Sequence, residues 1–214
     1  MILINQSSNL LYVDKNIGKD MMKRIEYAGR NCYASQDKIT EDSYSKFISN
    51  LLKRHHESPF EFADLTFDIT TSRAVLAEIT RHRLASFCVE SQRYIQEAKT
   101  GDITFIKPEW DTELPEDTAC ITWRLSMIQI ENDYKNLIAD GMKPEEAREV
   151  LPNSTACRII MKANVREWRH FFNLRCSPAA YPQMRSLALG MLKQAHEVMP
   201  DAFEDIYNVY FNAV

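Results

Sequence analysis

The sequence predicts an α+β fold in which helices flank a central antiparallel sheet. Residues 60–69 alternate between apolar and polar side chains, which is typical of a half-buried strand. Several longer segments instead repeat their apolar residues at helical spacing. The chain has no internal repeat, no Gly/Ser-rich linker and only five glycines in 214 residues. One continuous domain over residues 1–214 is therefore expected.

The expected elements follow from local patterns along the chain. Apolar periodicity, turn residues and capping residues set each boundary. Residues 155–163 fit a strand or a helix equally well. In chain order the other expected elements are a strand-like segment with a central turn at 2–13, helices at 19–29 and 41–57, a strand at 60–70, a helix from about 72 to 81, a short strand at 103–108, a helix at 119–140, a helix that starts at Pro144, and helices at 165–175 and 180–199.

Glycine and proline mark most of the predicted ends. Gly29 and Gly141 are expected to stop the helices before them, because glycine readily adopts the left-handed conformation after a helix. Pro59 and Pro200 are expected to end the helices that precede them. The alternation of the strand at 60–70 shifts after Phe62, which predicts a bulge.

Composition limits the possible classes of protein. The net charge is −4, which argues against a protein that coats nucleic acid, since such proteins carry a basic excess. No apolar stretch is long enough to span a bilayer, and residues 1–15 lack the pattern of a signal peptide. The five cysteines include no CxxC pair, so neither a metal site nor a disulfide framework is expected. A cytoplasmic protein without nucleic-acid or membrane partners is predicted.

Arginine is concentrated in two segments of this acidic chain. Residues 81–93 read RHRLASFCVESQR, and a second set comprises Arg148, Arg166, Arg169 and Arg175. If a helix ends near Arg81, the residues after it offer backbone N–H groups and guanidinium forks to phosphates or to an electron-rich heterocycle. A solvated or salt-bridged helix end would have the same composition, and composition alone favours that interpretation.

The segment 81–93 also resembles a known family. RHR followed by seven residues and serine is the defining motif of the flavin-dependent thymidylate synthases, and Ser91 completes it here. Three more segments match in family order: HESPFEF at 56–62, EEAREVLP at 145–152 and NVREWRHFFNLR at 164–175. Together the matches cover most of residues 55–190, which is far more specific than one motif.

The resemblance implies an enzyme and its ligands. The family makes dTMP from dUMP with 5,10-methylenetetrahydrofolate as carbon donor and NADPH as reductant through FAD, in homotetramers whose sites lie where subunits meet. The residues that match FAD-binding positions are His56, Ser58, Arg81, His82, Arg83, Val89, Asn164, Arg166 and His170. The residues that match dUMP-binding positions are Glu78, Arg81, Ser91, Arg93, Arg148 and Arg175.

Physical chemistry agrees with these implied roles. Arg175 is the expected catalytic residue, because a cation beside the uracil favours loss of the N3 proton and makes C5 more nucleophilic. Arg93 and Arg148 can grip the phosphate. Ser91 is expected to position the substrate, because the sequence identifies no base to activate it as a nucleophile. His82 is expected to contact the flavin rather than to transfer protons.

Other residues in the matched segments have more ordinary expected roles. Cys176 stands in RCSP, without the proline that precedes the nucleophile of cysteine-dependent thymidylate synthases, and is expected to be packed. Trp168, Phe171 and Phe172 could flank a flavin, but their helical spacing is more typical of a core.

The chain also differs from the family at several positions, and these differences keep other functions open. The differing residues are Phe62, Glu78, Cys88, Val89, Ala179 and Gln183. Changes on the flavin side would suit a flavoprotein with another substrate. The arginines would also suit a nucleotide- or RNA-binding protein, although no RNA-binding module is recognisable. A structural oligomer would not need arginines at the matched positions.

Overall fold

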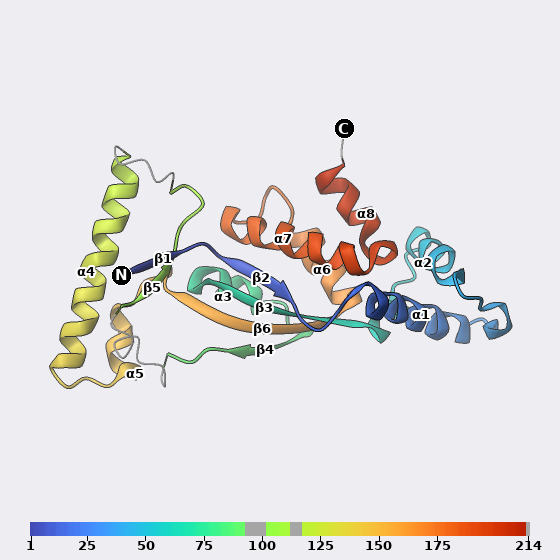
Figure 1. Ribbon diagram of the computed structural model, residues 1–214, viewed down its shortest axis with the longest axis horizontal. Helices are drawn as coiled ribbons and strands as arrows, with labels where there is room; N and C mark the ends of the chain where they lie inside the picture. The colour runs from blue at the N-terminus through green and yellow to red at the C-terminus, as the bar shows by residue number, and fades with distance from the viewer. Residues whose placement is uncertain (93–101, 112–116, 213–214) are drawn as a thin grey trace. The chain divides into compact units, whose positions relative to one another are not determined.

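The computed structural model describes residues 1–92, 102–111 and 117–212 (Figure 1). In chain order its elements are β1 Ile2–Ile4, β2 Ser7–Leu10, α1 Lys15–Asn31, a 3₁₀ turn Gln36–Lys38, α2 Ser43–Lys53, a 3₁₀ turn Ser58–Phe62, β3 Asp64–Ser72, α3 Arg73–Ile79, β4 Ala85–Val89, β5 Thr104–Ile106, α4 Thr118–Ala139, α5 Pro144–Ala147, a 3₁₀ turn Arg148–Val150, β6 Ala156–Asn164, α6 Val165–Arg175, α7 Pro182–Val198 and α8 Pro200–Phe211.

The described strands form two sheets. The larger is antiparallel and has the order β2-β3-β6-β4, and the smaller pairs β1 with β5 in parallel. The predicted α+β class with an antiparallel sheet is therefore confirmed. Residues 155–163, which fitted a strand or a helix, belong largely to strand β6, and its side chains alternate between buried and more exposed positions.

The chain divides into two compact units. Unit 1 comprises Met1–Ser7, Ile69–Arg81 and Cys88–Ile159, and unit 2 comprises Ser8–Asp68, His82–Phe87 and Ile160–Val214. The single domain expected over residues 1–214 stays a prediction.

The core of unit 1 lies between the parallel strand pair and α4 (Figure 1). Phe105 of β5 is buried there with Met127 and Tyr134 of α4. Asp117 caps the start of α4 by accepting hydrogen bonds from two backbone N–H groups. Gly141, with φ of 92°, follows its end as predicted. None of the helices in the described ranges has the length and apolarity that crossing a membrane requires.

The core of unit 2 is built on α6. The buried rings of Trp168, Phe171 and Phe172 pack against one another, and Trp168 also meets Phe67 of β3 edge-on at 5.0 Å. The indole Nε1 of Trp168 donates to the carbonyl of Leu65 at 3.0 Å. The prediction that these three aromatic residues form core is confirmed, so the opposite face of α6 is left to carry a site.

The predicted stop at Gly29 is wrong. Helix α1 continues to Asn31, and Gly29 is a buried position inside it. A Cβ atom at Gly29 would come within 2.6 Å of Cε1 of Phe47 on α2. The glycine therefore allows α1 and α2 to approach closely, which the local sequence could not reveal.

Two predicted boundaries near prolines also need correction. Helix α2 ends at Lys53, before Pro59, and residues 58–62 form a 3₁₀ turn instead of the start of a strand. The shift in alternation after Phe62 marks the junction of this turn with β3, so the predicted bulge is wrong. Pro200 follows α7, but it also begins α8, where a missing N–H costs nothing.

Candidate functional site

The segment RHR lies directly after α3. Ser72 caps α3 by accepting a hydrogen bond from the N–H of Val75, and the helix ends at Ile79. The predicted helix end near Arg81 is confirmed. The chain then turns so that Arg81 and Arg83 are exposed while His82 is buried. The three adjacent residues of the RHR motif therefore differ in their exposure to solvent.

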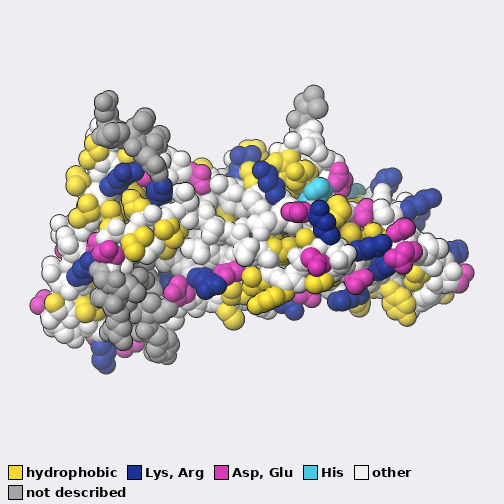
Figure 2. Space-filling model, in the orientation of Figure 1, with side chains coloured by type: hydrophobic (Ala, Val, Ile, Leu, Met, Phe, Trp, Pro, Cys, Tyr) yellow, Lys and Arg dark blue, Asp and Glu magenta, His cyan; other side chains and the backbone are white. Residues whose placement is uncertain are grey.

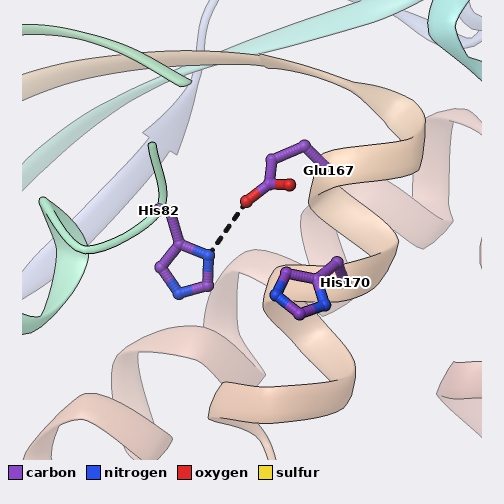
Figure 3. Close-up of side chains that lie close together, drawn as sticks. All are labelled: His82, Glu167 and His170. Carbon is purple, nitrogen blue, oxygen red and sulfur yellow. Dashed lines mark hydrogen bonds and ion pairs between the residues drawn. The ribbon is translucent and has the colours of Figure 1, made fainter. Parts of the chain in front are cut away.

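His82 meets four residues of α6 in unit 2. Its Nδ1 lies 3.0 Å from Oε1 of Glu167, and Nε of Arg175 donates to its Nε2 at 3.1 Å. The ring contacts Phe171 edge-on at 4.9 Å. The ring of His170 lies 5.7 Å from that of His82 (Figure 3). The structure thus joins two predicted site residues, His82 and Arg175, through a direct hydrogen bond.

The hydrogen bonds define the protonation of His82. The Nε–H of Arg175 can only donate, so Nε2 of His82 must be the acceptor and carries no proton. The neutral ring then has its proton on Nδ1 and donates it to Glu167. Burial lowers the pKa of His82 below 6.5; Glu167 opposes this shift, while the charges of Arg175 and His170 add to it.

The lowered pKa of His82 predicts a pH dependence of stability. As the pH falls below about 6.5, histidine in the unfolded chain takes up a proton that His82 in the folded chain does not. The free energy of unfolding should therefore decrease with falling pH in this range and be retained above it. Urea unfolding of the wild type and of His82→Gln at a series of pH values should show a smaller slope for the variant. Equal slopes would contradict the buried neutral histidine.

A cavity beside this cluster collects several predicted flavin-binding residues. Its volume is about 620 Å³, and it is lined by Glu57, Glu61, Leu84, Asn164, Arg166, Glu167 and His170. Asn164 Oδ1 caps α6 by accepting from the N–H of Glu167, so its amide nitrogen is the group that could donate to a ligand. Nη1 of Arg166 donates to Glu61 at 2.6 Å, and both side chains are about half-exposed.

A second hollow contains two more of the flavin candidates of unit 2, His56 and Ser58. Its volume is about 300 Å³, and its lining includes His56, Ser58, Glu57 and Arg166. The last two residues also line the larger cavity, so the two hollows share a wall. Nδ1 of His56 lies 3.2 Å from the hydroxyl of Tyr33. Asn164, Arg166, His170, His56 and Ser58 are therefore brought to one continuous surface.

Most of the predicted dUMP-binding residues belong to unit 1. Glu78 and Arg81 lie on and just after α3, and Ser91 follows β4. Nε of Arg148 donates to the carbonyl of Glu145 at 3.1 Å. Arg175 lies in unit 2 and Arg93 lies outside the described residues. Val89, a predicted flavin contact, ends β4 in unit 1.

His82, Glu167 and His170 also form a group whose ligand atoms lie within 4.8 Å of one another, as in a metal site. The hydrogen bonds favour a proton over a metal ion in this place. Nδ1 of His82 is protonated toward Glu167, and the Arg175 guanidinium contacts the other ring nitrogen. A divalent cation would have to displace that proton and withstand the charge of Arg175.

Two other positions singled out by the sequence have structural roles. Cys176 is buried, and burial raises the pKa of its thiol to about 12, which suits the expected packed residue. Gln183, which replaces a glutamate common in the family, is buried and accepts a hydrogen bond from the Tyr181 hydroxyl at 3.2 Å. Ala179 is exposed in the turn between α6 and α7.

Comparison with known proteins identifies the family. A family model described as thymidylate synthase complementing protein matches residues 13–201. The chain belongs to this family. It is 33% identical over 193 residues to the flavin-dependent thymidylate synthase of Geobacter sulfurreducens, covering 85% of this chain and 80% of the relative. It is 33% identical over 205 residues to the probable flavin-dependent thymidylate synthase of Mycobacterium phage L5, and the match covers 90% of this chain and 84% of the phage protein. The flavin-dependent thymidylate synthase of Pyrococcus furiosus is 35% identical over 175 residues, and the match covers 79% of this chain and 70% of that protein.

Membership of the thymidylate synthase complementing protein family confirms the resemblance inferred from RHR and the three further segments. The sequence interpretation missed Glu167, although a signal was present. Glu167 and His170 stand three residues apart on a predicted helix, which places both on one face. Glu167 could therefore have been assigned to the site together with His170.

Proposed function

We propose that this chain is a flavin-dependent thymidylate synthase that converts dUMP to dTMP. In this proposal 5,10-methylenetetrahydrofolate donates the carbon unit and NADPH reduces the bound FAD. The observation that carries the proposal is the arrangement around α6, where Asn164, Arg166 and His170 line one cavity and Arg175, the last residue of the helix, is held by His82. Family membership supplies the chemical class.

The residues around the cavity fit a flavin dinucleotide. Arg166 offers a guanidinium to a diphosphate, and the Asn164 amide and the His170 ring offer polar groups to ring heteroatoms. The Arg166–Glu61 pair does not prevent this, because a half-exposed ion pair is weak and exchanges readily for another anion. The adjoining hollow extends the surface to His56 and Ser58, which are also proposed to hold FAD. Arg81, His82, Arg83 and Val89 complete the proposed FAD set.

When bound, FAD would supply the hydride that completes the methyl group. The protein would bind, orient and polarise dUMP. Arg93 and Arg148 would hold its phosphate, and Glu78, Arg81 and Ser91 would orient the nucleotide. Arg175 would stabilise the uracil anion that forms when the N3 proton leaves. The buried thiol of Cys176 has a raised pKa, so it is poorly suited to attack the base.

The remaining parts of the proposal concern assembly and surroundings. The homotetramer, the sites where its subunits meet and the cytoplasmic location all stay predictions. On the face in Figure 2, basic and acidic side chains are intermixed. In unit 2, Lys19 and Lys23 pair with Glu41, for example. A mixed surface of this kind supports small-molecule partners over a nucleic acid, which needs a basic patch.

Two measurements test the function. The purified protein should be yellow, with the absorption bands of an oxidised flavin. With NADPH and methylenetetrahydrofolate it should release tritium from dUMP labelled at C5. A colourless protein that does not bind added FAD would disprove the proposal. A yellow protein that releases no tritium would favour the second candidate, a flavoprotein with a different substrate, for which the changes at Val89 and Ala179 are the motivating observation.

A further inference from the structure

Three side chains in unit 2 form a continuous hydrogen-bonded chain. Glu167 accepts from His82, and His82 accepts from Arg175, at 3.0 and 3.1 Å. Glu167 belongs to the first turn of α6, and Arg175 is its last residue. His82 comes from the turn before β4, and Figure 3 shows its bond to Glu167. Its other ring nitrogen accepts from Arg175, so His82 bridges the two. The guanidinium is thereby tied to the start of its own helix through a side chain from another element.

The chain of bonds has one consistent direction. Arginine keeps its proton at every relevant pH, so Nε2 of His82 must accept and Nδ1 must donate. An ionised Glu167 carboxylate has no proton to donate and can only accept, so it is a suitable partner for the N–H group at Nδ1 of His82. The side chains of His82 and Glu167 are 2% and 7% exposed, so water competes little for these bonds. If His82 carried its proton on Nε2 instead, that N–H group would point at the Nε–H group of Arg175 and no hydrogen bond could form.

We propose that Glu167 is a positioning residue that fixes the tautomer of His82 and through it the orientation of the Arg175 guanidinium. This inference rests on the proposed function, in which Arg175 stabilises the uracil anion. An arginine side chain has several rotatable bonds, and a single wrong orientation would move its charge away from the base. Holding Nε leaves the two terminal nitrogens with a defined direction, which is what electrostatic stabilisation of a developing charge requires.

The cost of losing Glu167 can be compared with known cases. Removing a partner that orients a metal-bound histidine usually costs 10- to 100-fold in affinity or activity. The same range, about 10- to 100-fold in turnover number, is expected for Glu167→Leu. Glu167→Gln keeps an oxygen that can accept from Nδ1 and should therefore retain more activity than the leucine variant. KM for NADPH should not change, because the defect lies in the stabilisation of the anion.

A matched control is available in α8. Nε2 of His196 and Oε2 of Glu204 form another histidine–glutamate pair at 2.5 Å, and Glu204 is exposed. Glu204→Leu removes the same kind of partner from a pair outside the proposed site, and its turnover number should equal that of the wild type. Flavin absorbance and the unfolding midpoint of each variant show whether it remains folded.

The tautomer itself can be observed without any activity. The chain has five histidines, so nitrogen NMR of protein labelled only in histidine is tractable, and His82→Gln identifies the His82 signals. His82 should show a protonated Nδ1 and an unprotonated Nε2 in the wild type and in Glu167→Gln, and a changed pattern in Glu167→Leu. A wild-type His82 with its proton on Nε2, or a fully active Glu167→Leu, would overturn the inference. If the wild type releases no tritium, the proposed function has failed, and the NMR comparison alone decides whether Glu167 fixes His82.

Discussion

Replacing Arg175 by alanine should lower the turnover number for dTMP formation by about 100- to 1000-fold, the usual cost of removing one donor to a developing anion. In the structure the guanidinium is held by His82 at 3.1 Å. In the proposed reaction it lies beside the uracil and favours the N3 anion. Flavin content should stay close to that of the wild type, because Arg175 is not among the residues that line the cavity of about 620 Å³. Tritium release from dUMP at saturating substrates measures the effect.

Two further variants make this prediction specific. Arg175→Lys keeps the charge but loses the planar fork and the Nε donor, so its activity should fall between those of the wild type and the alanine variant. Arg24→Ala removes an exposed arginine of α1 and should leave turnover unchanged. Full activity of Arg175→Ala would refute the role of Arg175, whatever the behaviour of the controls.

The sequence predicted elements well where the determining interaction is local. Ser72 and Gly141 act on backbone within a few residues of themselves, and both helix ends were located correctly. Predictions failed where a distant residue decides. Gly29 is required by Phe47 of the next helix. The turn Ser58–Phe62 has apolar residues at a spacing that also fits a strand, so periodicity could not distinguish the two.

The site could be predicted as a list of residues but not as an arrangement. The match to RHR indicated three adjacent ligand-binding residues. In the structure the backbone exposes Arg81 and Arg83 and buries His82. The partner of His82 is Glu167, which lies 85 positions later in the sequence. The helical spacing of Glu167 and His170 could indicate that Glu167 belongs to the site, but no local pattern pairs Glu167 with a residue so distant in the sequence. The chain Glu167–His82–Arg175 therefore required the fold.

The polar site and the apolar core depend on the same short helix. Helix α6 has only 11 residues, and an isolated helix of that length is marginal in water. Its stability must come from the buried side that carries Trp168, Phe171 and Phe172. The orientation of His170 on the other side, and of Arg175, which follows Phe171 by four residues on the buried side, consequently depends on how firmly these rings are packed.

Trp168→Ala should therefore destabilise the protein by about 3–5 kcal/mol, the usual cost of truncating a fully buried large aromatic residue. The change removes contacts with Phe67, Phe171 and Phe172 and leaves the carbonyl of Leu65 without the indole donor. Urea unfolding followed by far-ultraviolet circular dichroism measures the change in free energy. Flavin should be released in the same transition, because the cavity is lined by the polar face of α6.

The matched control for Trp168 is a tryptophan in unit 1. Trp110 is 49% exposed and meets Trp123 edge-on at 6.3 Å. Because it contributes little beyond one aromatic pair, Trp110→Ala should cost only about 1 kcal/mol and leave flavin bound. A loss below about 1 kcal/mol for Trp168→Ala would mean that neighbouring side chains refill the space. In that case the aromatic cluster would not be what holds α6, and the polar face would need another source of rigidity.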